Sequence, residues 1–203
     1  MSTREKLITE AAHLLDANGE PAVTLRAVAQ AVGVSHNAPY RHFVDRNDLL
    51  AGIAERDLRM LAAGIEAARA GDAPAIERLR SGLDCFVEYG RHYPARYRLM
   101  FSDPDIVSAG SALEAAGIAA FAAITGLVED GQKAGVLPAT PTLALANLIY
   151  ATTHGLIDLE IAGCVGEQEA LPVAEQGISL FLTLLQQSAE AGRGQSEEPP
   201  AGS

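Results

Sequence analysis

The most constraining feature of the sequence is a short helical pattern that ends at a glycine, within residues 24–43, TLRAVAQAVGVSHNAPYRHF. Apolar residues recur at helical spacing from Leu25 to Val32, and the hydroxyl of Thr24 can cap the orphan amides that begin this helix. Gly33 ends the helix, because glycine adopts the left-handed conformation of a tight turn without steric cost. The pattern predicts two helices joined by a sharp turn, a helix-turn-helix.

The second helix of this motif is expected to be very short, over residues 36–43, with Ser35 as its cap. Pro39 complicates this interpretation, because a proline at the fourth position removes the first helical hydrogen bond. Either the helix opens with a distorted turn, or Asn37 is the true cap. Phe43 is expected to turn inward and anchor the helix to the core.

The exposed start of that second helix would present side chains suited to DNA. His36 and Asn37 can donate to and accept from base edges in a major groove, and Tyr40 and Arg41 suit phosphate contacts. The next helix begins at Arg46, where the helix dipole also favours a phosphate. The expected DNA-binding residues are Thr24, Arg26, Ser35, His36, Asn37, Ala38, Tyr40, Arg41, His42 and Arg46.

Charge is distributed unevenly along the chain. The net charge of −11 argues against simple electrostatic coating of nucleic acid. Residues 1–46 carry five basic and five acidic side chains, so the whole negative charge lies in residues 47–203. A neutral, histidine-containing head on an acidic body is the resulting expectation.

The rest of the chain also has a helical pattern. Alanine accounts for 37 residues and tryptophan is absent, which favours an all-α fold. The expected helices cover residues 4–18, 46–70, 74–93, 94–101, 110–134, 141–163 and 172–190, in addition to the motif above. Residues 191–203 carry too little apolar surface to order themselves and are expected to be a disordered tail.

Aromatic and polarizable side chains cluster in the middle helices, which predicts a largely apolar ligand pocket with a few polar groups. Plain core packing is the alternative for each of them. The expected ligand-binding residues are Phe86, Tyr89, Tyr93, Tyr97, Met100, Phe121 and His154. A metal site and a cofactor are not expected, since His92 and His154 lack a third ligand at suitable spacing.

The last two long helices, 141–163 and 172–190, are too apolar to remain in water. Two such helices from each subunit would bury one another, which predicts a homodimer through a four-helix interface. Burial within one chain is the alternative. The candidate interface residues are Leu143, Ala146, Ile149, Ile157, Ile161, Ile178, Phe181, Leu182 and Leu185.

The order of elements and the string GVSHNAPYRHF, followed after Val44 by DRNDLL, resemble the TetR (tetracycline-repressor-like) family of bacterial regulators over about residues 4–60. The resemblance implies an N-terminal three-helix DNA-binding head on a helical, ligand-binding body. It also implies a homodimer that binds palindromic operators, usually represses, and leaves DNA when a small ligand moves the fourth helix. The chain departs from the family in having Arg46 where lysine is usual and Pro39 where an aliphatic residue is usual. Residues 150–155, YATTHG, resemble a C-terminal subtype in which tryptophan stands in place of Tyr150.

These observations predict a helix-turn-helix domain at 1–46, a helical ligand-binding and dimerisation domain at 47–190, and the tail. Residues 46–70 would form the helix that connects the two domains. The expected protein is a cytoplasmic, ligand-responsive repressor with no membrane segment, no cofactor and no enzyme activity. It would bind double-stranded operator DNA and an unidentified apolar or amphipathic effector. The alternative is a helical small-molecule-binding protein or enzyme that does not engage DNA.

Overall fold

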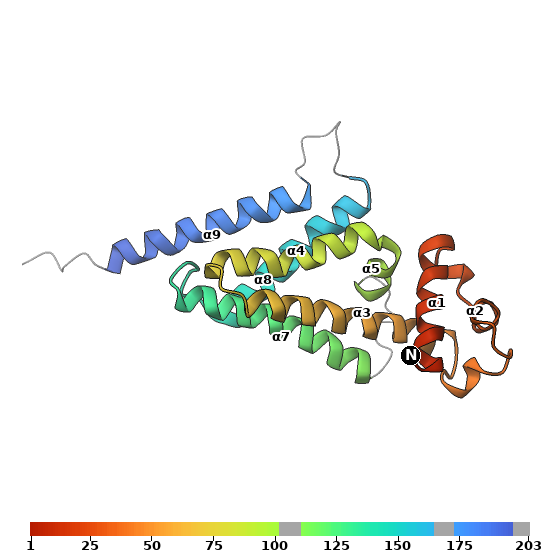
Figure 1. Cartoon of the computed structure of the whole chain (residues 1–203). Helices are drawn as coiled ribbons and strands as arrows, with labels where there is room; N and C mark the ends of the chain where they lie inside the picture. The colour runs from red at the N-terminus through yellow and green to blue at the C-terminus, as the bar shows by residue number, and fades with distance from the viewer. Residues whose placement is uncertain (102–110, 165–172, 197–203) are drawn as a thin grey trace, which may run out of the picture. The chain divides into compact units, whose positions relative to one another are not determined.

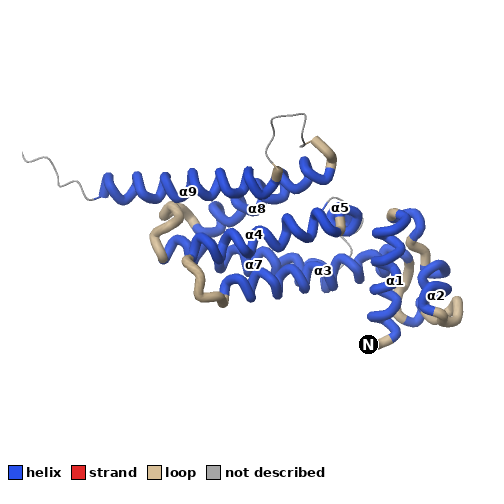
Figure 2. The backbone as a smooth tube through the Cα atoms, turned by 45° about the horizontal axis from the view of Figure 1, so that its top comes forward, coloured by secondary structure: helices blue, strands red, loops and turns tan. Residues whose placement is uncertain are grey.

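The computed structural model describes residues 1–101, 111–164 and 173–196, and every regular element in these residues is a helix (Figure 2). The expected all-α fold is therefore confirmed. The chain divides into two compact units, Met1–Ala62 with Tyr89–Ala120 and Ala63–Glu88 with Phe121–Ser203. Residues are contributed to both units by the long helices α3 (Arg46–Arg69), α4 (Ala75–His92) and α7 (Ser111–Lys133).

The first unit is built around its N-terminal helix. Besides parts of the three long helices it contains α1 (Thr3–Asn18), the 3-10 turns η1 (Glu20–Ala22) and η2 (Pro39–Arg41), α2 (Leu25–Val32) and α5 (Pro94–Phe101). α1 packs against α2, η1 and α5 (Figure 1). The apolar stripe expected on α1 is buried, since Ile8, Ala11 and Leu15 are at most 3% exposed.

Local hydrogen bonds begin and end the first two helices as the sequence predicts. Ser2 and Glu5 form a capping box at the start of α1. The hydroxyl of Thr24 accepts the Ala27 amide at 3.1 Å and caps α2. Gly33 adopts a φ of 76° in the left-handed region and ends α2. Each cap satisfies a backbone group that a helix end would otherwise leave unpaired.

The prediction of an α-helix over residues 36–43 is wrong. The structure has a turn in which the Ala38 amide donates to the Ser35 carbonyl at 2.8 Å, followed by the 3-10 turn η2. Pro39 is buried and has no N–H, so the regular α-helical bond at that position cannot form. Of the two alternatives, the distorted opening is the one observed, and neither Ser35 nor Asn37 provides a side-chain cap.

The start of α3 closes the motif. The Asp48 amide donates to the Asp45 carboxylate at 2.9 Å, and the Asp48 carboxylate accepts the Val44 amide at 2.8 Å. Phe43 turns inward as expected and is 2% exposed. A Cβ at Gly52 would lie 3.4 Å from the Phe43 ring, so the ring packs closely against α3. The helix-turn-helix is thus fixed to α3 by one aromatic anchor.

The second unit contains parts of α3, α4 and α7 together with α8 (Thr142–Ile161) and α9 (Ala174–Ser196), which pack side by side (Figure 1). Glycine allows close approach in this unit, because a Cβ at Gly82 would lie 2.5 Å from the Leu127 side chain. Arg69 of α3 is paired with Asp130 of α7, with Nε at 2.9 Å from Oδ2. These contacts join α3, α4 and α7.

The structure bears on two expectations about the second half of the chain, the start of the tail and the absence of a membrane segment. The tail was expected to begin at residue 191, but α9 continues to Ser196, and residues 197–203 lie outside the described part. Ala189 is buried and Arg193 lies against Gly135, so tertiary contacts extend the helix beyond the residues that its apolar pattern covers. Ala112–Lys133 is long and apolar enough to cross a membrane by length and composition alone, and 44% of its most apolar window is buried inside the protein. The same profile is typical of a core helix in a soluble protein.

Candidate functional site

The residues expected to bind DNA form an exposed surface over α2, η2 and the turn between them. Tyr40 is 60% exposed, which is unusual for a large aromatic side chain. Thr24, Arg26, Ser35, His36, Asn37, Arg41 and His42 are also exposed, whereas Ala38 is half-buried. We call this set of exposed residues, with Tyr40, the head surface.

The head surface differs in charge from the rest of the molecule. Residues 24–44 contain Arg26 and Arg41 but neither aspartate nor glutamate, although the whole chain has a net charge of −11. Two guanidinium groups without a competing carboxylate on the same segment suit phosphate oxygens. The Thr24 hydroxyl accepts one amide as a cap and keeps its own O–H to donate. The surface therefore offers donors where a DNA backbone would offer acceptors.

The turn before Pro39 changes how the base-reading side chains are held. His36 and Asn37 lie in a hydrogen-bonded turn between Ser35 and Ala38, not along an α-helix. Pro39 and Phe43, which follow them in the chain, are buried, and this fixes the turn to the core. Both imidazole and amide side chains can donate and accept, as base edges require. Their role in DNA binding stays a prediction.

Arg46 is held more tightly than the sequence indicated. Its Nε donates to the Val23 carbonyl at 2.8 Å, and Nη2 donates to the Glu20 carbonyl at 2.7 Å and the Glu20 carboxylate at 2.9 Å. These bonds tie the start of α3 to the turn between α1 and α2. A phosphate contact from Arg46 would compete with them, so the structural role is the better supported one.

The predicted ligand-binding residues divide between the two units. In the second unit Phe86, Phe121 and His154 gather around Tyr150, which the sequence analysis left out of the pocket. The rings of Tyr150 and His154 are 4.1 Å apart, and the Phe121 and Phe86 rings lie 5.5 Å and 6.3 Å from Tyr150. The position of Tyr150, four residues before His154 on one helix, was the signal that identifies it. We call these four residues the aromatic cluster.

Burial sets the protonation states in the aromatic cluster. It lowers the pKa of His154 to about 4, so the imidazole is neutral near pH 7. Burial also raises the pKa of the Tyr150 phenol above its usual value. The cluster is thus an uncharged, aromatic environment with one imidazole and one phenol. Side chains of this kind suit apolar ligands that also accept or donate one or two hydrogen bonds.

In the first unit, Tyr89, Tyr93, Tyr97 and Met100 are held by other contacts. Tyr97 and Met100 belong to the core, at 0% and 4% exposed. The Tyr89 hydroxyl donates to the buried carboxylate of Asp57 at 2.6 Å, and the Tyr93 ring lies under the guanidinium of Arg96. Burial and the nearby charge of Asp57 raise the pKa of Tyr89. These contacts favour structural roles for the four residues, and ligand binding by them stays a prediction.

The charged residues of this network were missed by the sequence analysis. Asp57 is 1% exposed and Arg96 is 8% exposed. Asp57 follows Leu50 by seven residues and Ile53 by four, so the apolar period of α3 already placed a carboxylate on its buried face. An acidic residue at such a position requires a partner. That partner, Arg96, could not be identified from spacing along the chain.

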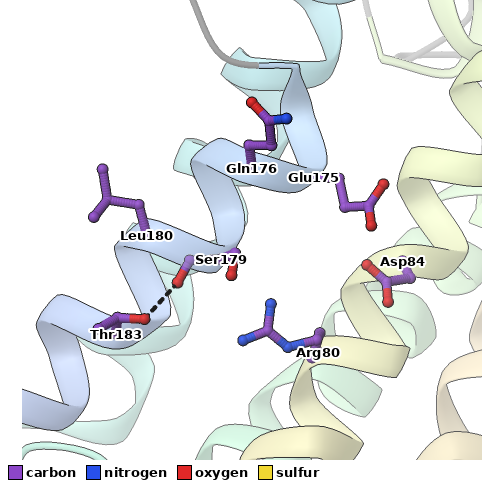
Figure 3. A pocket seen from close by; sticks show the side chains of 7 residues that line it. All are labelled: Arg80, Asp84, Glu175, Gln176, Ser179, Leu180 and Thr183. Atoms are coloured by element: carbon purple, nitrogen blue, oxygen red, sulfur yellow. Dashed lines mark hydrogen bonds between the residues drawn. The ribbon is translucent and has the colours of Figure 1, made fainter.

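A groove of about 410 Å³ lies on the second unit between α4 and α9 (Figure 3). Its mixed lining includes Arg80 and Asp84 from α4 and Glu175 and Thr183 from α9. None of the expected ligand-binding residues lines it. Among the described residues, no group of histidine, cysteine, aspartate and glutamate could hold a metal ion.

Exposed leucines mark α8 and α9. Leu143, Leu148 and Leu159 on α8 and Leu180 and Leu184 on α9 are between 43% and 60% exposed. By contrast, five of the expected interface residues pack inside the chain: Ala146, Ile149, Ile157, Ile178 and Leu182. Those five cannot contact a second subunit, because each helix turns them toward its own core. The exposed leucines are the better candidates for an interface.

Comparisons with known proteins match both parts of the chain. Residues 7–53 match the family model of bacterial regulatory proteins of the tetR family, and residues 79–181 match the tetracyclin repressor-like C-terminal domain. The nucleoid occlusion factor SlmA of Vibrio vulnificus is 31% identical over 98 residues, 48% of this chain and 50% of that protein. The transcriptional activator FasR of Mycolicibacterium smegmatis is 26% identical over 100 residues, 49% of this chain and 46% of that protein. The chain thus spans about half the length of the curated relatives it matches.

A solved structure extends the likeness to almost the whole fold. A protein of unknown function from Rhodococcus sp. RHA1 superposes with a TM-score of 0.77 at 26% identity, over 92% of this chain and 95% of that one. Both family models and this superposition agree with an N-terminal helix-turn-helix followed by a helical C-terminal domain.

Proposed function

Because the chain belongs to the TetR family of bacterial regulators, we propose that it is a ligand-responsive transcriptional regulator that binds palindromic operator DNA as a homodimer. The head surface is the observation that carries this proposal. It places Arg26 and Arg41 on an exposed helix-turn-helix without a single carboxylate in residues 24–44. On a chain with a net charge of −11, that segment is suited to face phosphates while the acidic body stays away from them.

The side chains of the head surface divide into two roles. Arg41, Tyr40, Arg26 and Thr24 would contact phosphates, which position the protein without reading sequence. His36 and Asn37, on the turn that precedes η2, would contact base edges. This division follows the chemistry of each group, since imidazole and amide side chains can both donate and accept hydrogen bonds. Ser35, Ala38 and His42 flank these contacts.

The homodimer would form through α8 and α9. The exposed leucines of both helices are large apolar groups that water covers poorly, and a second copy of the same two helices would bury them in a four-helix arrangement. Dimerisation also serves DNA binding, because two heads about one turn of DNA apart, ~34–36 Å, can engage a palindrome together.

The effector would bind at the aromatic cluster of the second unit. An uncharged lining of Phe86, Phe121, Tyr150 and His154 favours a small apolar or amphipathic molecule, and its binding would release the operator. We place the protein in the cytoplasm, as a repressor without enzyme activity. The domain boundaries that follow are a DNA-binding domain at 1–46 and a ligand-binding and dimerisation domain at 47–190.

Selection of DNA from a random duplex library by the purified protein tests the proposal. We expect enrichment of a palindrome, with an affinity that falls steeply as salt rises, because bound phosphates release counterions. Failure to enrich any palindrome at low ionic strength would contradict the proposal and favour a helical small-molecule-binding protein. A reporter gene behind the selected operator then distinguishes repression from activation.

A further inference from the structure

A buried arginine of α5, Arg96, links α1 to α3 within the first unit. The Arg96 Nε donates to Asp16 Oδ1 at 2.9 Å, and its Nη2 donates to Asp16 Oδ2. On the other side, Nη1 lies 3.5 Å from Asp57 Oδ2. Arg96 belongs to α5, Asp16 to the last turn of α1, and Asp57 to the middle of α3. We call these three residues the Arg96 latch.

The neighbouring side chains hold the Arg96 guanidinium in a single position. Asp57 accepts the Tyr89 hydroxyl at 2.6 Å and the Arg56 Nε at 2.8 Å, so its buried carboxylate is fully engaged. The Tyr93 ring covers the guanidinium at 4.3 Å. Burial alone would lower the pKa of Arg96, but the hydrogen bonds to Asp16 and the charge of Asp57 outweigh it, and the net pKa is raised. The arginine is therefore permanently charged and held from several directions.

The bidentate ion pair between Arg96 and Asp16 restricts the geometry of the Arg96 latch. Nε and Nη2 of the guanidinium meet the two oxygens of Asp16 in parallel, which restricts the angle as well as the distance between α5 and α1. Buried ion pairs contribute little net stability but can specify one geometry over others. α1 also packs directly on α2, the first helix of the DNA-binding motif. A restriction on α1 is thus passed to the motif.

We propose that the Arg96 latch sets the orientation of the DNA-binding head and thereby the half-site spacing that the homodimer accepts. This proposal rests on the proposed function, since spacing matters only to two heads on one palindrome. Arg96 is a positioning residue in this scheme: it contacts no DNA, and it acts through Asp16 on α1. A head held at one angle matches one distance between half-sites, whereas a head that swings accepts several.

The test uses Asp16→Asn in the full-length protein, with Glu10→Gln as the matched control. Both changes replace a carboxylate with an amide on α1, but only Asp16 belongs to the latch. Asp16 is exposed, so its substitution leaves the Asp57–Arg96–Tyr89 contacts in place. Affinity is measured for the selected palindrome and for versions with the half-sites about one or two base pairs closer or further apart.

We expect wild type and Glu10→Gln to prefer the selected spacing sharply. Asp16→Asn should lower that preference by about tenfold, the factor that corresponds to one lost charge-assisted hydrogen bond. Its affinity for a single half-site should match that of wild type. Arg96→Gln, which removes both sides of the latch, should change the spacing profile in the same direction.

A spacing profile of Asp16→Asn that matches wild type would overturn the proposal. Equal weakening at every spacing would also overturn it, because that result indicates a structural role alone. Should Arg96→Gln fail to fold, Asp16→Asn still decides between these results. If the wild-type protein binds no palindrome, that result contradicts the proposed function and not the role of the Arg96 latch. The failure of one proposal can therefore be distinguished from the failure of the other.

Discussion

The substitution Gly126→Ala should destabilise the protein when residue 69 is arginine and stabilise it when residue 69 is alanine. A Cβ built on Gly126 would lie 2.3 Å from Arg69 Nη1, 2.5 Å from Cζ and 3.0 Å from Nε. These are the three nearest atoms, and all of them belong to Arg69. The Arg69 side chain therefore crosses α7 directly over Gly126, where no side chain obstructs its passage to Asp130. Gly126→Ala would displace it.

Two opposing contributions set the change in the free energy of unfolding that Gly126→Ala causes. Alanine is favoured over glycine in a helix interior by ~1 kcal/mol. Against this stands the loss of the paired hydrogen bonds from Arg69 to Asp130, at 2.9 Å and 3.3 Å. The two side chains are 32% and 20% exposed, so solvent screening reduces the pair to ~2 kcal/mol. Gly126→Ala alone should thus lower the free energy of unfolding by ~1 kcal/mol.

The assay is a double-mutant cycle by urea denaturation. In an Arg69→Ala background the obstructing atoms are gone, and Gly126→Ala should raise the free energy of unfolding by ~1 kcal/mol. A matched change at Gly117, where a Cβ would meet nothing within 4 Å, should be stabilising in both backgrounds. If Gly126→Ala has the same sign with and without Arg69, the obstruction does not govern stability and the reasoning is refuted.

Three further outcomes are expected. Arg41→Ala should weaken binding to all DNA sequences and make the salt dependence shallower by ~1 phosphate contact, whereas His36→Ala should relax base preference at one position by ~1–3 kcal/mol, both measured on an operator panel. Leu180→Glu should shift the protein from dimer to monomer in sedimentation, while Ile118→Glu, at an exposed apolar position of α7, should not. Because the folded-state pKa of His154 is lowered to about 4, the folded state binds fewer protons than the unfolded state below the ordinary pKa of 6.5. Stability is then lost as pH falls from 6.5 toward 4, by ~3 kcal/mol, and His154→Asn should remove that part of the acid dependence in urea titrations.

The helices were predictable where local chemistry decides them. Apolar residues at helical spacing placed α1 and α2, and the Thr24 hydroxyl and Gly33 marked where α2 begins and ends. Phe43 was expected inside on the same grounds and is buried. These features depend on residues a few positions apart, so the order of residues carries the information.

The prediction failed where one residue opposed the pattern. The spacing of residues 36–43 favoured a helix, but Pro39 lacks the amide that an α-helix needs, and a turn with a 3-10 segment forms instead. The C-terminal end of α9 was also misplaced, because packing continues past its apolar stretch. Both errors concern boundaries, where a single hydrogen bond or contact decides the outcome.

The candidate site shows the same division. The side chains of the head surface follow each other in the sequence, and their exposure could be anticipated from the motif. The aromatic residues of the body could be identified as a group, but which of them lie against one another could not. Phe86, Phe121 and His154 gather around Tyr150 in one unit, while Tyr89 serves a buried carboxylate in the other.

The order of amino acids alone thus determined the helical elements, their caps and the exposed basic motif, because these arise from interactions within a turn or two of one helix. Only the tertiary structure decided which helices meet and which charges are paired. Arg96 and Asp16 are 80 residues apart, and no periodicity links them. Their bond exists because folding removes both helices from water at a place where an unpaired charge would be costly.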